Sequence, residues 1–565
     1  MCNEIFISNE CKAALHSLLG CGNLTDMSYE EFTAAQTKIL EQFVTNTSSH
    51  VFALRNLPEV IKGALFSRYS RSTLGLRSLL LKEFILSEDT AFSAIAGHHR
   101  EGHASQEQMV AVQKAQGFYD RILDGYGDDS IGELGGAHLA VENVSMLGAK
   151  VLEDARIGGS PLEKSTRYVY FDQKVRGEYL FYKEPVLMTS AHRDLFLQTC
   201  NRLFETYSRL IPAVTTIIEK TFAQDPAISK TAYAAALRAK VLDCLRGLLP
   251  AGTLTNMGVF GNGRFFEGLL QKLHGHSLSE LREIGKLGYE ELSKVIPSFV
   301  RRANPEHRHC KAFVQFTETM QADLKQVAQR HAGKVEHSAE VGARLVSFDA
   351  DGPSKVAGAL LFGLTEGSLG DLQRYCKQLS DEELGRILDA ASLCRENRRH
   401  KSPRALEHAS FTFELVADFG IYRDLQRHRM LTQERQLLTC NYGYYTPSEI
   451  VGTPVESEYV QALDTAKKAY DVIAAEFPEE AQYVVPMAYN IRWYFHCNLR
   501  ALQWLCELRS QAAGHPGYRL IAQQMAAQTS KALPLFERFF KFVDFNGYDL
   551  GRLSAEIRQE QKIKL

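Results

Sequence analysis

The segment HKSPRALEHASFTFELVADFGIYRDLQRHRMLT (residues 400–432) places three adjacent basic residues after a strongly apolar stretch. Apolar residues alternate with mostly polar neighbours over positions 411–419, which is the period of a half-buried β-strand. Gly420 breaks this pattern, and a helix is predicted from about Tyr422. That helix would set Arg423 and Arg427 one turn apart on one face. The segment therefore predicts a strand followed by a helix that carries a cationic cluster.

The three adjacent basic residues are Arg427, His428 and Arg429, and three potential cations repel one another unless they hold an anion. Asp424 would lie one helical turn below His428, where it could orient the imidazole and favour its charged form. Arg427 and Arg429 would point to opposite sides of the helix. A solvated basic face is the commoner meaning of such a cluster. Its position beside a buried strand and among apolar residues favours an anion site.

The composition describes soluble globular domains. The chain has 565 residues, of which 45% are hydrophobic and 23% charged, and its formal net charge is -2. There is thus no overall basic field of the kind that attracts nucleic acid. No run reaches the roughly 18 apolar residues of a membrane span. The 11 cysteines contain no C-x-x-C pair, so we expect neither a metal site nor disulfides, and the cytoplasm is the expected compartment.

Landmarks of the first half of the chain recur in the second half in the same order. The matching positions are 57–69 with 352–364, 130–133 with 402–407, 185 with 447, and 250 with 486. Pro250 precedes the Asn262-Gly263-Arg264 triplet by twelve positions, and Pro486 precedes Asn498 by the same twelve. Two diverged copies of one domain explain this spacing.

We therefore predict an N-terminal extension over residues 1–50, a first copy over 51–315 and a second copy over 316–565. The joint is expected in the polar, weakly patterned stretch 301–337.

At residues 400–432 the second copy resembles the flavin-dependent thymidylate synthases. The signature of that family is Arg-His-Arg, then Ser, Glu, and Ser-x-Arg-Tyr at fixed spacing, preceded by a segment like H-x-S-x-L-E-H. The second copy has Arg-His-Arg at 427–429 and Thr432 where the family has Ser. The distal half is missing, because Arg435, Leu437 and Thr439 stand at the family's Glu, Ser and Arg positions.

The first copy shows the reverse pattern in ARIGGSPLEKSTRY (residues 155–168). Its matches to the distal half are Ser160, Glu163, Ser165, Arg167 and Tyr168, whereas Arg-His-Arg is replaced by Ala155-Arg156-Ile157.

The later part of the family pattern is divided between the copies in the same way. The first copy keeps Arg246, Pro250, Asn262 and Arg264 but has Leu273 in place of the last arginine; the second has Gln482 in place of the first arginine and keeps Asn498, Arg500, Arg509 and His515. Each copy retains what the other has lost, so the resemblance implies one composite site.

The resemblance implies an α+β protein made of two tandem copies of the flavin-dependent thymidylate synthase fold, each a sheet flanked by helices. Residues implied to face FAD are Ser402, Arg427, His428, Arg429, Asn498, Arg500 and His515. Residues implied to bind dUMP are Glu163, Ser165, Arg167, Arg246 and Arg509. Catalytic roles fall on Arg427, His428 and Arg509, because cationic groups polarise the pyrimidine. Fork-shaped guanidinium groups suit both anionic ligands.

The implied reaction is the reductive methylation of dUMP to dTMP. Reduced flavin delivers hydride, methylenetetrahydrofolate supplies the carbon and NADPH reduces the flavin again. Family members are homotetramers with sites between subunits, so a fused pair of copies is expected to form a homodimer that acts as a pseudo-tetramer.

Two other functions stay open at the level of sequence, namely a related flavoenzyme acting on another pyrimidine nucleotide and a nucleotide-binding scaffold without turnover. Three local patterns have plainer explanations than a site. His99 and His103 are spaced for a metal but lack a third ligand. The glycine cluster in GVFGNGRFF (residues 258–266) is weak evidence for a dinucleotide loop, and it aligns with the Asn-x-Arg segment. The tyrosines at 442, 444 and 445 suit an aromatic strand in the core.

Overall fold

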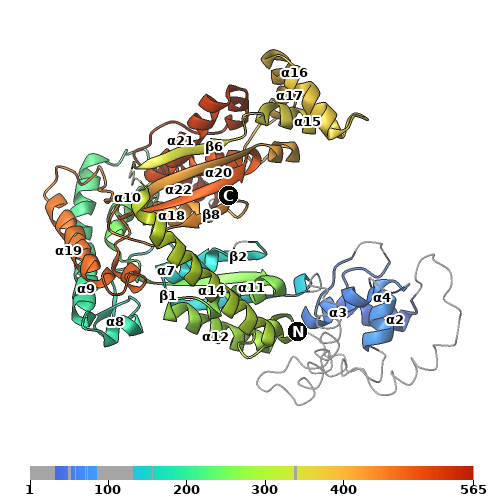
Figure 1. The fold of residues 1–565 in the computed structure, drawn as a ribbon, viewed down its shortest axis with the longest axis horizontal. Helices are drawn as coiled ribbons and strands as arrows, with labels where there is room; N and C mark the ends of the chain where they lie inside the picture. The colour runs from blue at the N-terminus through green and yellow to red at the C-terminus, as the bar shows by residue number, and fades with distance from the viewer. Residues whose placement is uncertain are drawn as a thin grey trace.

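The computed structural model of the chain describes residues 32–48, 52–57, 59–69, 72, 74–85, 132–155, 157–335 and 340–563. The protein is α+β, as predicted, with two helix-flanked antiparallel sheets (Figure 1). A single continuous apolar core extends from Ala137 to Val543 and includes residues of both predicted copies.

The first sheet has the strand order β1-β5-β2. Its strands are β1 (Gly136–Ser145), β5 (Leu254–Asn262) and β2 (Gly159–Glu163). Alternate residues of β5 are buried, which is the period expected of a strand with one covered face. Helices α11 (Gly263–His274) and α12 (Ser279–Val295) pack on that face.

The second sheet has the order β6-β7-β9-β8. Its strands are β6 (Gly342–Phe348), β7 (Ser410–Asp418), β9 (Asn490–Asn498) and β8 (Thr432–Arg435), followed by helices α20 (Leu499–Arg509) and α21 (Pro516–Ala532). The strand predicted over 411–419 is confirmed as β7. The order β7-β9-β8 repeats β1-β5-β2, and β6 extends the second sheet by one strand.

The pairing register supports this equivalence. Gly136 pairs with Asn262 in the first sheet, and Ser410 pairs with Asn498 at the same position of the second. Both asparagines cap the helix that follows, because each side chain accepts a backbone N–H three residues later. The shared Asn-x-Arg pattern thus marks a strand-to-helix junction in both copies.

The two copies meet around a local two-fold arrangement at their shared prolines. Pro250 and Pro486 face each other in an isolated antiparallel bridge. Ala251 N–H donates to Val485 O at 2.9 Å, and Met487 N–H donates to Leu249 O at 2.9 Å. Residues at matched positions therefore form the same contact in both directions, as expected for two copies of one domain.

Short helices follow the first strand of each pair, namely α7 (Met146–Glu153) and α18 (Phe419–Leu425). Asp418 caps α18 by accepting the Ile421 N–H at 2.9 Å, so the helix begins three residues before the predicted Tyr422. The helix ends at Leu425, and the basic cluster therefore lies in the following turn rather than on the helix.

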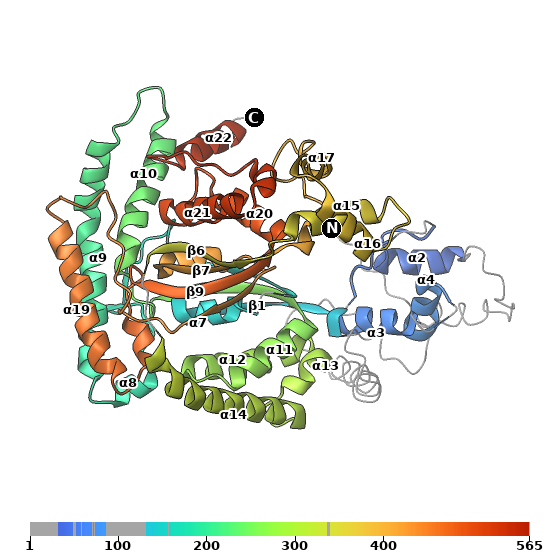
Figure 2. The same ribbon diagram turned by 45° about the horizontal axis from the view of Figure 1, so that its top comes forward.

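Long helices close one end of the molecule, at the left of Figures 1 and 2. They are α9 (Arg193–Thr221), α10 (Lys230–Leu245) and α19 (Glu456–Ala474). Helix α9 packs against both α10 and α19 and so links the two copies.

Most of the stretch predicted to contain the joint, residues 301–337, forms helix α14 (Arg308–His331). Its residues are mostly exposed, and only Cys310 is buried, because the helix lies at the periphery (Figure 2). The boundary predicted between residues 315 and 316 falls inside this helix.

The described N-terminal helices form a separate small apolar cluster. They are α2 (Ala34–Phe43), α3 (Glu59–Tyr69), α4 (Leu76–Leu79) and the π-helical η1 (Leu80–Ile85). The second-copy counterpart of α3 is α15 (Gly352–Phe362), which joins the main core instead.

The remaining elements are short or peripheral. They are β3 (Lys174–Val175), β4 (Glu178–Tyr179), α8 (Pro185–Thr189), α13 (Pro297–Val300), α16 (Leu369–Gln378), α17 (Asp381–Ser392), α22 (Leu553–Ile563), and the 3-10 turns η3 (Arg246–Leu248), η4 (Arg301–Ala303), η5 (Ala332–Lys334), η6 (Arg404–His408), η7 (Glu480–Val484) and η8 (Pro534–Phe540).

Candidate functional site

The retained halves of the two motifs lie against each other within one chain. Glu163, the last residue of β2, has a fully buried side chain that binds three cations. Arg423 lies 2.6 Å from its Oε1, while Lys150 and Arg427 lie 2.9 Å and 3.4 Å from its Oε2. Burial opposes ionisation, but these cations lower the pKa of Glu163 to about 2. The carboxylate therefore joins the first copy to the second.

The basic turn at residues 427–429 runs along strand β2. Arg429 donates from Nη1 to Gly159 O at 2.9 Å and to Ser160 Oγ at 3.1 Å. Arg-His-Arg from one copy thus contacts the Ser and Glu positions that the other copy retains.

A cavity of about 620 Å³ opens beside this turn, which is within the usual size range of ligand pockets. Its lining residues are Arg395, Arg398, Lys401, Ser402, Glu407, Arg427, His428, Arg429, Met430, Leu431, Asn498, Arg500, Ala501, Gln503, Trp504, Glu507, Leu508 and Arg509. The structure thus brings together six of the seven residues that the resemblance assigns to FAD, with His515 outside.

Arg500, in the first turn of α20, is held by two partners. Its Nε donates to Ser402 O at 2.8 Å, and its Nη1 lies 2.9 Å from Glu407. The first copy repeats this ion pair between Arg264 and Glu133, also at 2.9 Å. The Arg264–Glu133 pair is about half exposed. The repeated ion pair therefore stabilises the strand-to-helix junction in both copies, and in the second copy its arginine also lines the large cavity.

One wall of the cavity is apolar. Trp504 and Met430 are exposed large side chains there, and the Arg398 guanidinium lies 5.6 Å from the Trp504 ring centre. A flat aromatic ligand could stack on this wall while its anionic groups reach the arginines.

The prediction that Asp424 orients His428 is wrong. Arg509, not Asp424, contacts it, because Arg509 Nε donates to His428 Nε2 at 2.9 Å. The imidazole is therefore a neutral acceptor, and burial together with Arg509 lowers the pKa of His428 well below its usual value. The predicted charged form is also wrong. Asp424 lies instead 3.4 Å from Arg246.

Arg167 of the first copy lies near Arg509, because both side chains contact Tyr518. It forms two hydrogen bonds of 2.7 Å with Asp243 and one of 3.2 Å with Tyr518 Oη. The Arg509 guanidinium lies 5.5 Å from the ring centre of the same Tyr518. Tyr518 thus bridges the arginine of the first copy and the arginine that borders the large cavity.

The other nucleotide-side residue, Arg246, borders a buried polar space of about 10 Å³. Three buried atoms there have no hydrogen-bond partner among the described residues, namely Arg246 Nη2, Asp418 Oδ2 and Tyr459 Oη. Burial raises the pKa of Asp418 to about 6. Such a space has room for about one water molecule.

Two predicted residues have local structural roles. Ser165 Oγ accepts the Arg167 N–H at 3.2 Å, which shapes the turn that carries this arginine. His515 caps α21 through its Nδ1, which lies 3.1 Å from Gly517 N, and it lines the small space beside Arg246 rather than the large cavity. Burial and the nearby Arg246 lower the pKa of His515 to about 3.

The reciprocal position, built from the lost halves of the motifs, is filled by protein side chains. Glu280 accepts from Ser145 N and Oγ at 2.7 and 2.6 Å and from Tyr483 Oη at 2.9 Å. Arg435 donates to the Gln482 side chain at 3.3 Å. Leu273, the counterpart of Arg509, is buried in the core. Among the described residues, the contacts between motif halves join the halves that the two copies retain.

Four residues of the site were not predicted from the sequence, namely Arg395, Arg398 and Trp504 in the cavity wall and Asp243 as the partner of Arg167. A signal for Trp504 was present, because it stands one helical turn after Arg500 on α20. Asp243 stands one turn before Arg246, but no pattern linked it to Arg167.

The structure also bears on the three local patterns that had plainer explanations than a site. GVFGNGRFF spans β5 and α11 in an antiparallel sheet, which is not a dinucleotide-binding turn. The predicted tyrosine strand is wrong, since residues 442–445 form a loop with one isolated bridge at Tyr444. His99 and His103 lie outside the described residues.

Two further features are absent from the described ranges. No helix there is long and apolar enough to cross a bilayer. No cluster of three or more potential metal-ligating side chains occurs there.

Comparison with known proteins identifies the family. A family model described as "Thymidylate synthase complementing protein" matches residues 86–298 and 364–535. A UPF0159 protein of Chlamydia pneumoniae is 57% identical over 94% of this chain and 98% of its own length. Another, of Chlamydia muridarum, is 57% identical over 94% and 99%, and one of Thermoplasma acidophilum is 33% identical over 89% and 99%. The two separate matches fall on the two copies of the fold, and the chain belongs to the thymidylate synthase complementing protein family.

Proposed function

We propose that the chain is a flavin-dependent thymidylate synthase with one composite site. The observation that carries this proposal is the direct contact between the motif halves, in which Arg427 and Arg423 bind Glu163 beside a large cavity lined by arginines. The overall reaction converts dUMP, methylenetetrahydrofolate, NADPH and a proton into dTMP, tetrahydrofolate and NADP⁺. The chain's own residues bind and orient these anionic molecules.

The residues of the large cavity fit FAD. Arg427, Arg429 and Arg500 offer guanidinium donors for a pyrophosphate, and the apolar wall around Trp504 suits an aromatic ring. When bound, the flavin would supply hydride transfer, which protein side chains cannot perform. His428, held as a neutral acceptor by Arg509, would orient that arginine toward the neighbouring substrate.

The pyrimidine nucleotide would bind beside Arg509 and Arg167. Arg246 carries a buried donor without a partner among the described residues, and Tyr518 lies between Arg167 and Arg509. A nucleotide phosphate would compete with Asp243 for Arg167, because the two hydrogen bonds of this pair use the same guanidinium edge. Arg509 would polarise the pyrimidine carbonyl as charge develops on it.

Flavin binding can be tested with a matched pair of arginines. Arg500→Ala is expected to raise the Kd for FAD by roughly 10- to 150-fold, because a hydrogen bond to a charged group contributes about 1.5–3 kcal/mol. Arg264→Ala removes the same ion pair from the first copy and should leave FAD binding unchanged. Fluorescence titration of the apoprotein measures both values and the number of sites.

We expect one FAD per chain. Protein that stays colourless after incubation with FAD would refute the flavin assignment. Two equivalents, or equal losses in the two variants, would place flavin in both copies.

We further propose that two chains form a homodimer. The helix-free face of the sheet is open in both copies, with Phe260 48% exposed on β5 and Tyr494 41% exposed on β9. A second copy of the chain would cover these apolar side chains. Sedimentation equilibrium should give twice the chain mass of 63.5 kDa. Phe260→Glu should shift the protein toward monomer, whereas a wild-type protein that stays monomeric at high concentration would contradict the proposal.

A further inference from the structure

The C-terminal segment of the chain crosses from the second copy to the first, directly over Arg167. After η8 it is held to α21, where Arg519 Nη2 donates to Asn546 O at 2.7 Å, and to the end of α20, where Asp544 N–H donates to the Oγ of the C-cap Ser510 at 2.9 Å. Its last helix, α22, then packs against α10 of the first copy, as Figures 1 and 2 show. The segment lies outside the matched family region, which ends at residue 535.

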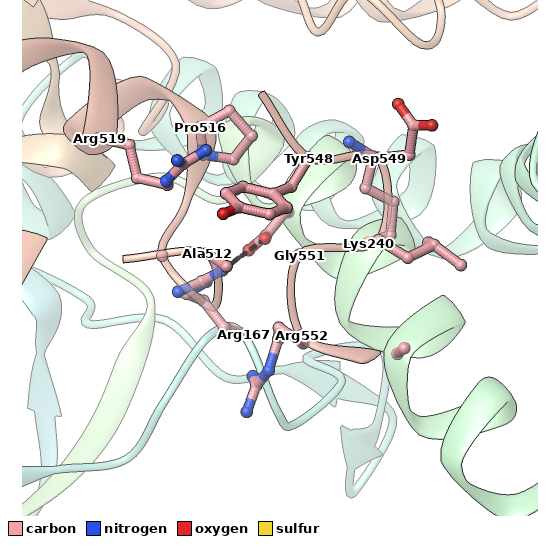
Figure 3. A pocket seen from close by; sticks show the side chains of 13 residues that line it. Arg167, Lys240, Ala512, Pro516, Arg519, Tyr548, Asp549, Gly551 and Arg552 are labelled. Atoms are coloured by element: carbon pink, nitrogen blue, oxygen red, sulfur yellow. Dashed lines mark hydrogen bonds and ion pairs between the residues drawn. The ribbon is translucent and has the colours of Figure 1, made fainter. Parts of the chain in front are cut away.

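A small cavity lies beneath this segment, between three parts of the chain (Figure 3). Its lining residues are Arg167, Ala236, Lys240, Asp243, Ala512, Gly514, Pro516, Arg519, Tyr548, Asp549, Leu550, Gly551 and Arg552. Four of these residues are cations and two are carboxylates. Each of the four cations also lies near a carboxylate, namely Arg167 near Asp243, Lys240 near Glu449, Arg519 near Asp544 and Arg552 near Glu556.

Most of these charges are already paired. Asp243 holds Arg167 through two hydrogen bonds, and Lys240 forms an ion pair with Glu449. Arg519 donates to the backbone carbonyls of Ser510 and Asn546. These contacts leave Arg552 as the lining cation to consider as a donor for a ligand.

Two buried N–H groups of Arg552 have no hydrogen-bond acceptor among the described residues. Its guanidinium lies 4.0 Å from the Tyr168 ring centre, and its Nη2 donates to Tyr168 Oη. Glu556 lies 3.6 Å from Nη2. Nε and Nη1 are buried and have no hydrogen-bond partner among the described residues. Buried guanidinium donors are normally satisfied, so this pair indicates a missing acceptor.

Tyr168, which holds the Arg552 side chain, belongs to the motif of the candidate site. Tyr168 is the last residue of the Ser165-x-Arg167-Tyr168 motif, so the C-terminal segment is fastened to the turn that carries the candidate phosphate-binding arginine. Gly551 lets the segment approach the loop between α20 and α21 closely, because a Cβ there would meet Ala512 O at 2.0 Å.

We propose that Arg552 is a further binding residue for the phosphate group of the nucleotide, supplied by the C-terminal segment and acting beside Arg167. This inference rests on the proposed function for the identity of the ligand. The cavity measures about 20 Å³, room for about one water molecule. Phosphate entry therefore requires residues 548–552 to shift outward and then close on the phosphate oxygens through Nε and Nη1 of Arg552.

The test compares Arg552→Ala with Arg558→Ala, which removes an exposed arginine from helix α22, directly after the turn that holds Arg552. Calorimetric titration with dUMP and with deoxyuridine separates phosphate recognition from base recognition. Arg552→Ala should raise the Kd for dUMP by about tenfold or more and leave the Kd for deoxyuridine and the flavin absorbance unchanged. Arg552→Lys, which keeps the charge but loses the fork, should show a smaller loss. Arg558→Ala should match the wild type.

Unchanged dUMP affinity in Arg552→Ala, or an equal loss for deoxyuridine, would overturn the inference. Thermal unfolding of each variant without ligand distinguishes lost binding from lost folding. A wild-type protein that binds no dUMP would refute the proposed function, and inorganic phosphate then becomes the probe. A rise in Tm with phosphate that Arg552→Ala abolishes supports the anion site, and the absence of such a rise in the wild type overturns it.

Discussion

Replacing Glu163 with alanine is expected to lower the free energy of unfolding by about 3–5 kcal/mol, the usual result of removing one partner from a buried ion pair. The carboxylate is fully buried and binds Arg423, Lys150 and Arg427, which come from both copies. Without it, these three cations lie close together and lose their shared carboxylate, although Lys150 keeps its ion pair with Glu153. Denaturant unfolding followed by circular dichroism measures the change.

Glu434→Ala provides the control, because Glu434 occupies an exposed position on β8; exposed substitutions of this kind change stability by about 0.5 kcal/mol or less. Glu163→Gln, which keeps the volume but not the charge, should fall between the two. If Glu163→Ala unfolds at the wild-type denaturant concentration, the ion cluster does not hold the copies together.

Acid should produce the same effect as the substitution. The pKa of Glu163 is lowered from 4.5 to about 2 in the folded protein, so the unfolded chain binds the proton more readily. Its contribution to stability is therefore present above about pH 4.5 and is lost as the pH falls toward 2. Glu163→Gln should lose less stability than the wild type across that window.

Replacing Arg509 with alanine is expected to reduce kcat by about 10²–10³-fold, the usual cost of removing one group that stabilises developing charge. Arg509 borders the large cavity, contacts His428 and lies over Tyr518. Turnover of dUMP with methylenetetrahydrofolate and NADPH is the measurement, and flavin absorbance verifies that the cofactor is still bound.

The matched control is Leu273→Met at the equivalent position of the first copy, because a volume-conserving change in the core is usually tolerated. Arg167→Ala should instead raise the Kd for dUMP tenfold or more. Wild-type dUMP affinity in the Arg167 variant would remove the main support for the thymidylate assignment and favour a different pyrimidine nucleotide. Loss of turnover in Leu273→Met equal to that in Arg509→Ala would contradict a single composite site.

The sequence by itself determined the local elements and the duplication. Strand β7 follows from the alternation of buried and polar residues over 411–419, because a strand turns successive side chains to opposite faces. The equivalence of Pro250 with Pro486 and of Asn262 with Asn498 follows from constant spacing, since matched residues mark the same strand and helix junctions.

Only the tertiary structure decided which charges meet. The partner of His428 is Arg509, 81 residues away, and the partners of Glu163 include Arg423, 260 residues away. Helical spacing suggested Asp424 for His428, but α18 ends at Leu425 and its cap at Asp418 sets the direction of the turn that follows. The strength of an ion pair depends on the distance between the two charged groups and on their burial. The periodicity of a sequence gives neither the distance nor the burial for residues that lie in different copies of the fold.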